Sequence, residues 1–108
     1  MTRTPLSDRS EAQQLAAAEQ VLGHNFNDRF VLRTAFTHAS WTGWTENYER
    51  LEFLGDRVLG LVLTGHLFSR FPEADQGELT KRYHHLSNEA ALAAICQALK
   101  IQDFIICD

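Results

Sequence analysis

Three acidic side chains recur at helical spacing within residues 47–60, which read NYERLEFLGDRVLG. They are Glu49, Glu52 and Asp56, at positions i, i+3 and i+7. At 100° per residue of an α-helix, these side chains fall within an arc of about 60° on one helix face. Neighbouring carboxylates repel one another, and hard divalent cations such as Mg²⁺ and Mn²⁺ prefer oxygen ligands. The spacing therefore indicates a divalent-metal site that acts on a phosphodiester.

The helix that carries these acids is predicted to be the central, buried element of the fold. Apolar residues point nearly all round it, which is the pattern of a helix covered on every side. These residues are Leu51, Phe53, Leu54, Val58, Leu59, Leu61, Val62, Leu63, Leu67 and Phe68. A buried, unpaired carboxylate is costly or takes up a proton. We therefore expect the acids to lie away from water and to need a cation.

A simpler interpretation of the acids is also open. Glu49 and Glu52 lie in the first turns of the helix, where acids favour the positive helix end. There they would be solvated and would pair with Arg50 or Arg57.

The rest of the chain is predicted to be helical. Apolar residues recur at helical spacing over residues 10–22, 29–38, 47–71, 75–86 and 89–99. Each segment begins at, or directly after, a residue whose side chain can cap a helix, namely Ser10, Asp28, Asn47, Asp75 and Asn88. Gly23 and Pro72 are expected to end the first and third helices. No long alternating pattern of apolar and polar residues occurs, so the fold class is all-α.

The acidic stretch resembles the signature of the ribonuclease III family, whose endonuclease domain carries an ERLEFLGD-type block in its central helix. Residues 49–56 match that block letter for letter. A second stretch, LGHNFNDRFVLRTAFTHAS at residues 22–40, resembles the amino-terminal part of the same domain. The resemblance covers residues 20–104 and implies the helical endonuclease-domain fold around one long central helix.

The resemblance also implies an activity. Enzymes of the family hydrolyse double-stranded RNA with a divalent metal, leaving 5′-phosphate and 3′-hydroxyl ends, as in the processing of rRNA and mRNA. Position by position, Glu52 matches a metal ligand and Asp56 matches the catalytic, metal-binding acid. Glu49 matches a residue near the subunit interface and the RNA cleft. Phe53 matches the aromatic residue that inserts into the partner subunit, which implies a two-fold homodimer.

Two features depart from the family pattern. Gln76 stands where the family has a further acid, and a neutral amide does not offset the charge of a cation. The family completes its metal site with an Asp-x-x-Glu pair on a later helix, several tens of residues beyond Asp56, and neither Asp103 nor Asp108 supplies that pair. We therefore expect residues 10–108 to be a partial endonuclease domain, carboxy-terminally truncated and inactive or weakly active alone. We expect these 108 residues to lack the family's double-stranded-RNA-binding domain, and residues 1–9 to be a flexible end.

Charge and composition limit how the chain could contact RNA and where in the cell it could act. The chain has a formal net charge of −4, and its pI is about 5.7, so no overall basic field favours RNA. RNA contacts must then be local or metal-mediated, and the basic residues Lys81, Arg82, His84 and His85 are one candidate surface. The sequence has no apolar run long enough for a membrane span and no signal-peptide core, which indicates a cytoplasmic protein. Cys96 is expected to be a small buried residue of the last helix, and Cys107 a free thiol.

Other readings of the same residues remain open. The chain could be a non-catalytic, ribonuclease-III-like module for dimerisation or for scaffolding RNA. A ferritin-like carboxylate bundle would need Glu-x-x-His pairs, which are not seen here. His38 is a general base, a ligand or a structural residue at a helix end. Trp41 and Trp44 either stack on a base or pack against the central helix or a subunit contact.

Overall fold

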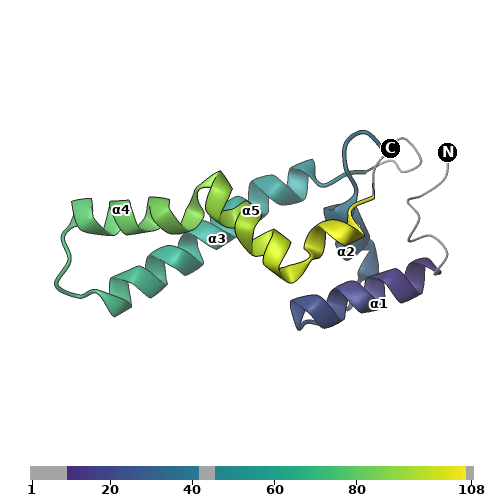
Figure 1. The fold of residues 1–108 in the computed structure, drawn as a ribbon, viewed down its shortest axis with the longest axis horizontal. Coiled ribbons are helices and arrows are strands. Elements are labelled where there is room, and N and C mark those ends of the chain that lie inside the picture. Colours follow the sequence, from purple (N-terminus) through teal and green to yellow (C-terminus); the bar gives the residue numbers. More distant parts are fainter. Residues whose placement is uncertain (1–9, 42–45, 107–108) are drawn as a thin grey trace.

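The computed structural model describes residues 10–41 and 46–106, and the sequence predictions for residues 1–9, Trp44 and Cys107 lie outside this part. The described residues form α1 (Glu11–Leu22), α2 (Arg29–Phe36), α3 (Glu49–Arg70), α4 (Gln76–Ser87), α5 (Glu89–Leu99) and the short 3₁₀ helix η2 (Ile101–Phe104), as Figure 1 shows. Over these residues the chain has no β-strand, only an isolated bridge between Thr37 and Ile106. The predicted all-α class is confirmed.

The helices begin where the capping residues predict. The side-chain oxygens of Ser10, Asp28, Asp75 and Asn88 accept hydrogen bonds from the backbone N–H groups of Gln13, Phe30, Glu78 and Ala91, respectively. Each bond satisfies an N–H group that has no partner within its own helix. Gly23 ends α1 with a φ of 69°, a left-handed conformation that glycine adopts without steric cost.

Two helix ends differ from the sequence prediction. The second helix stops at Phe36 because Thr37 is extended and the chain there pairs with the carboxy-terminal segment. The N–H of His38 donates to the Ile106 carbonyl, and the N–H of Ile106 donates to the Phe36 carbonyl, both at 2.8 Å. The third helix begins at Glu49, whose N–H donates to the Asn47 side chain at 2.9 Å. The N-cap residue is therefore Tyr48, which makes no side-chain capping bond, and not the predicted Asn47.

The helices make an elongated molecule with a small core at one end. Helices α3 and α4 pack against each other as an antiparallel arm, while α2 packs against α3, and α1 packs against α2 and η2 (Figure 1). The described part measures 53 × 25 × 24 Å and has a radius of gyration of 16.5 Å. A compact domain of this length would have a radius of gyration of about 13 Å. Much of the arm is therefore left without a covering layer.

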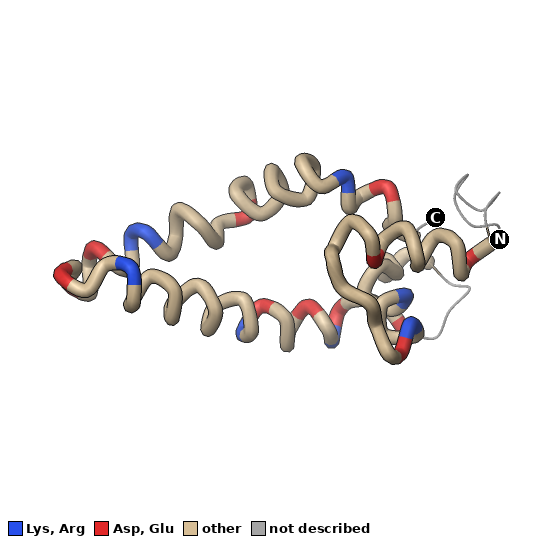
Figure 2. The backbone as a smooth tube through the Cα atoms, turned by 90° about the horizontal axis from the view of Figure 1, so that it is seen from below, with Lys and Arg blue, Asp and Glu red and all other residues tan. Residues whose placement is uncertain are grey.

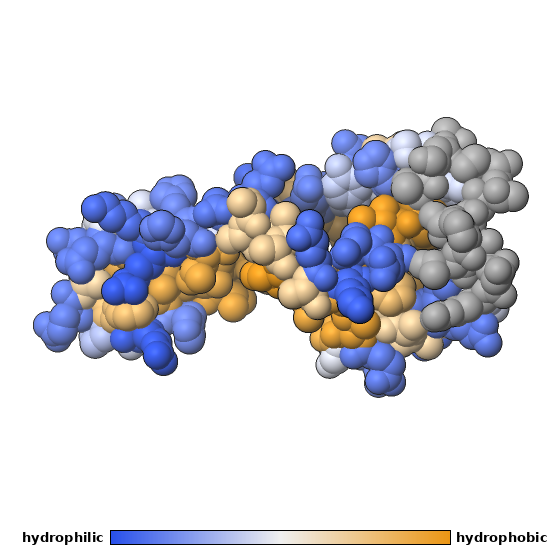
Figure 3. All heavy atoms as spheres, viewed as in Figure 1, coloured by the Kyte–Doolittle hydropathy of each residue, from blue (hydrophilic) through white to orange (hydrophobic). Residues whose placement is uncertain are grey.

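The prediction that the third helix is buried on all sides is wrong for this chain. Leu67 is the one buried residue of α3, whereas Phe53, Leu61 and Phe68 are 65%, 75% and 72% exposed. The reason is that α4 covers one side of α3, and α5 packs against α4 and η2 instead. Figure 3 shows apolar atoms at the surface along the arm, between bands of polar atoms. The buried apolar residues of the described part are Ala18, Leu32, Trp41, Leu67 and Ile106.

Two further observations concern Cys96 and the capacity of the helices to cross a membrane. Cys96 is exposed on α5, so the prediction that it is buried is wrong. Its helix is covered on too few sides to enclose it. Among the described helices, none combines the length and the apolar character that crossing a membrane requires.

Candidate functional site

The three acids lie on consecutive turns of α3, as the spacing predicts, but they are not buried. Residues 49–70 are one continuous helix, so Glu49, Glu52 and Asp56 share one face. All three are exposed, and the Asp56 side chain is 68% exposed. The expectation that they lie away from water is therefore wrong. Because the acids are exposed, burial does not create a need for a cation at this site.

The acidic face of α3 is continuous with the face that packs on α4. Gly60 and Leu67 lie within about 40° of Asp56 around the helix. The Tyr83 hydroxyl on α4 approaches Gly60, and Leu67 is 4% exposed. Figure 2 shows the acidic positions of α3 on the part of the helix from which α4 and α5 diverge. The acids therefore point to the side of α3 that α4 covers further along.

Glu52 and Asp56 are the two acids whose spacing suits a shared ion. They are one helical turn apart, and their oxygens are the donors that Mg²⁺ prefers. In the described part of the chain, no group of three or more His, Cys, Asp or Glu side chains gathers around one ion position. The pair thus fits a Mg²⁺ ion that keeps most of its waters, and it does not form a closed protein cage.

Among the described residues, Arg57 is a cation that contacts this pair. Its Nη1 atom lies 3.4 Å from Asp56 Oδ2, and its guanidinium lies 4.1 Å above the ring centre of Phe53. From the sequence, Arg57 was predicted to pair with Glu49 or Glu52. This prediction missed Asp56 because adjacent residues on a helix do not normally face each other. The long arginine side chain makes the contact by folding back over Phe53.

Phe53 and Glu49 meet at an open groove between α2 and the start of α3. The groove has a volume of about 1060 Å³ and is lined by Phe30, Val31, Thr34, Glu46, Asn47, Glu49, Arg50, Leu51, Phe53 and Leu54. The charged residues of the lining are Glu46, Glu49 and Arg50. Glu52 and Asp56 do not line the groove. Glu49 therefore has different surroundings from Glu52 and Asp56, although all three share a helix face.

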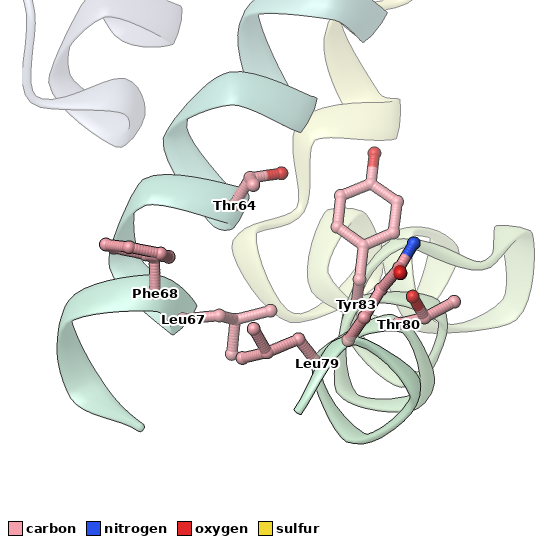
Figure 4. A pocket seen from close by; sticks show the side chains of 7 residues that line it. Thr64, Leu67, Phe68, Leu79, Thr80 and Tyr83 are labelled. Carbon is pink, nitrogen blue, oxygen red and sulfur yellow. The ribbon is translucent and has the colours of Figure 1, made fainter. Parts of the chain in front are cut away.

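Gln76 lies far from the acid pair in this chain. It lines a second cleft, of about 390 Å³, between α3 and α4, together with Thr64, Leu67, Phe68, Leu79, Thr80 and Tyr83 (Figure 4). Leu67 is 11 positions beyond Asp56, which is about 16 Å along the helix axis. The structure therefore does not bring Gln76 to Glu52 and Asp56.

The remaining candidates have structural surroundings. The His38 Nδ1 atom lies 2.8 Å from Ser40 Oγ, and its ring stacks on Tyr48 with centroids 6.0 Å apart. Trp41 is 7% exposed, so it packs in the core and does not offer a face to a base. Both observations favour the structural alternative.

The basic side chains of α4 are all exposed. They are Lys81, Arg82, His84 and His85. The Arg82 guanidinium lies 3.8 Å above the Phe71 ring centre, which ties it to the α3–α4 turn. No described contact links this surface to the acid pair.

Comparison with known proteins bears on this site. Residues 49–108 match the family model of the ribonuclease III domain. The chain is 46% identical over 93 residues to Ribonuclease 3 of Nitrobacter winogradskyi, covering 82% of this chain and 35% of that protein. It is also 46% identical over 93 residues to Ribonuclease 3 of Rhodopseudomonas palustris, covering 83% of this chain and 34% of that protein. The chain thus spans about a third of the length of these curated relatives.

Solved structures show the same fold. One structure of the nuclease domain of ribonuclease III from Campylobacter jejuni superposes with a TM-score of 0.80 at 40% identity, covering 91% of this chain and 66% of that one. That structure is described as showing flexibility in a region involved in dimer formation. A second structure of the same nuclease domain gives a TM-score of 0.79 at 39% identity, covering 93% of this chain and 65% of that one.

Proposed function

This chain belongs to the ribonuclease III family, and from that premise we propose that it is part of a metal-dependent endoribonuclease that cuts double-stranded RNA. The products would carry 5′-phosphate and 3′-hydroxyl ends, in the processing of rRNA or mRNA in the cytoplasm. The observation that carries the proposal is that residues 49–56, which match the family block, form a helix presenting Glu52 and Asp56 side by side to solvent.

Glu52 and Asp56 would hold the metal, Mg²⁺ with Mn²⁺ as a substitute. When bound, the ion would offset charge on the phosphate and lower the pKa of a water molecule. Because both carboxylates are exposed, RNA and water can reach them without an opening of the core. Two carboxylates bind such an ion weakly, so the chain by itself would be inactive or weakly active. The other ligand positions would be filled by water, by RNA phosphate, or by carboxylates outside these 108 residues.

The partner of the chain would be a second copy. Phe53 is 65% exposed on the edge of the groove between α2 and α3, where an aromatic anchor gains most from being covered. In a two-fold dimer each Phe53 would contact the same patch of the other subunit. Glu49, which lines this groove, would then lie near both the interface and the RNA.

The activity is tested with the protein extended to the length of its curated relatives. Duplex RNA is incubated with Mg²⁺, with EDTA, and with the variants Glu52→Gln and Asp56→Asn. We expect the unchanged protein to cleave with Mg²⁺ but not with EDTA, and neither Glu52→Gln nor Asp56→Asn to cleave, while their circular dichroism melting curves stay the same. Glu73→Gln, an exposed acid at the far end of the arm, is the matched control and should cut normally. Normal cutting by Asp56→Asn would overturn the proposal.

A non-catalytic module for dimerisation or RNA scaffolding is the second candidate. Gln76, in place of a family acid, is the observation that favours it. Calorimetric titration with Mn²⁺ separates the two candidates. The scaffold predicts no heat that depends on Glu52 or Asp56, whereas the nuclease predicts weak binding that Asp56→Asn removes.

A further inference from the structure

Two contacts on α3 hold the guanidinium of Arg57 next to Asp56. Its Nη1 atom lies 3.4 Å from both Asp56 Oδ2 and the backbone carbonyl oxygen of Phe53. Its Cζ atom lies 4.1 Å from the centre of the Phe53 ring. Phe53 and Arg57 are one helical turn apart, the spacing at which two side chains of one helix meet. The ring thus acts as a platform that keeps a positive charge beside this carboxylate.

A cation in that position competes with a divalent metal for the same oxygen atoms. The guanidinium offsets the charge of Asp56 and repels a second cation that approaches it. We propose that Arg57 is the resident counter-ion of Asp56 and lowers the affinity of this carboxylate for divalent metal. The inference rests on the metal site proposed above, and it assigns to Arg57 a positioning role that acts through Asp56.

The chain offers a matched control in Arg50. Arg50 lies on the same helix, is exposed like Arg57, and precedes it by seven residues, which is about 10 Å along the axis. Removing either arginine changes the net charge of the chain by the same amount. Only Arg57 has a contact with Asp56 among the described interactions. A difference between the two variants therefore reports the contact with Asp56, because Arg50 lies about 9 Å from Asp56 along the axis and about 160° from Glu52 around the helix.

The experiment follows Mn²⁺ binding at the site itself. Paramagnetic broadening of the backbone amide signals of residues 52–57 is measured in the ¹⁵N-labelled 108-residue chain as Mn²⁺ is added. The variants are Arg57→Gln, Arg50→Gln and Asp56→Asn, each at low and at high salt. We expect Arg57→Gln to bind Mn²⁺ about 2- to 5-fold more tightly than the unchanged chain, the range that an exposed ion pair supports. Arg50→Gln should bind like the unchanged chain.

Salt and a conservative variant separate an electrostatic role from a purely structural one. The gain from Arg57→Gln should shrink at high salt, and Arg57→Lys should stay close to the unchanged chain because it keeps the charge. Broadening that depends on Asp56, with equal affinity in Arg57→Gln and the unchanged chain, would overturn the role of Arg57 alone. Absence of any broadening that depends on Asp56 would overturn the metal site and this role together.

Discussion

The hydroxyl oxygen of Tyr83 lies 3.0 Å from the position that a Cβ atom would take on Gly60. This contact joins α4 to α3 one helical turn beyond Asp56, on the face that also carries the acid pair. It therefore sets how closely α4 approaches the helix, and from which side.

Substitution of Gly60 tests this contact. Alanine in place of glycine normally stabilises a helix by about 1 kcal/mol, but overfilling a packed contact costs about 1–3 kcal/mol. We expect Gly60→Ala to leave unfolding stability unchanged or lowered. Gly65→Ala should raise it, because no atom lies within 4 Å of the added Cβ. Urea denaturation followed by circular dichroism measures both. In a Tyr83→Phe background, Gly60→Ala should become stabilising; the same loss in both backgrounds would contradict the role of the hydroxyl.

The buried carboxylate of Glu19 predicts a pH dependence of stability. It is 4% exposed and accepts hydrogen bonds from the Arg29 side chain and from the backbone N–H of Phe26, both at 2.8 Å. The bond from Arg29, followed by that from Phe26, lowers the pKa of Glu19 below its ordinary value of 4.5, although burial acts in the opposite direction. A lowered folded-state pKa stabilises the fold at pH values above the unfolded-state pKa, and this stability is lost as the pH falls through the folded-state pKa.

Glu19→Gln isolates that effect. The variant should be less stable than the unchanged chain at pH 7, and the difference should disappear well below pH 4.5, the ordinary value for this group. The midpoint of urea unfolding, measured at a series of pH values, reports it. Glu73→Gln, an exposed acid, serves as control and should track the unchanged chain. A Glu19→Gln curve parallel to that of the unchanged chain would show that the ion pair does not titrate with folding.

The proposed dimer contact predicts that two exposed apolar residues of α3 behave differently. Phe53 and Val62 are 65% and 61% exposed, and they lie about 180° apart around the helix. A charge within an apolar contact is costly to bury. We expect Phe53→Asp to give a monomer in sedimentation velocity at tens of micromolar chain, whereas Val62→Asp keeps the dimer. Loss of the dimer only in Val62→Asp would place the contact on the opposite face.

The start of α4 offers a test of helix capping in the arm. Asp75 accepts a hydrogen bond from the Glu78 N–H at 2.9 Å. Replacing it with alanine removes this bond and should lower unfolding stability by about 1 kcal/mol. Asp75→Asn keeps an oxygen in the same place and should cost much less. Thermal melts compare the two variants; equal losses would mean that the negative charge, and not the hydrogen bond, is what stabilises this end.

The all-α class, the helix starts and the shared face of the acids follow from the amino-acid sequence. They depend on local chemistry, in which a capping side chain and its N–H are two or three residues apart. The block at residues 49–56 is likewise contiguous, so family membership could be inferred from it. Such features need no knowledge of what packs where.

Other features were decided by tertiary structure alone. The apolar pattern of α3 shows that its residues favour burial, but it cannot say which neighbour covers them; here α4 covers one side and leaves the acids in water. The distance of Gln76 from Asp56 and the stacking of Arg57 on Phe53 were also not foreseen. These contacts depend on where α4 crosses α3 and on which way a long side chain folds. Each is set by packing between groups whose separation in space is not encoded in their spacing along the chain.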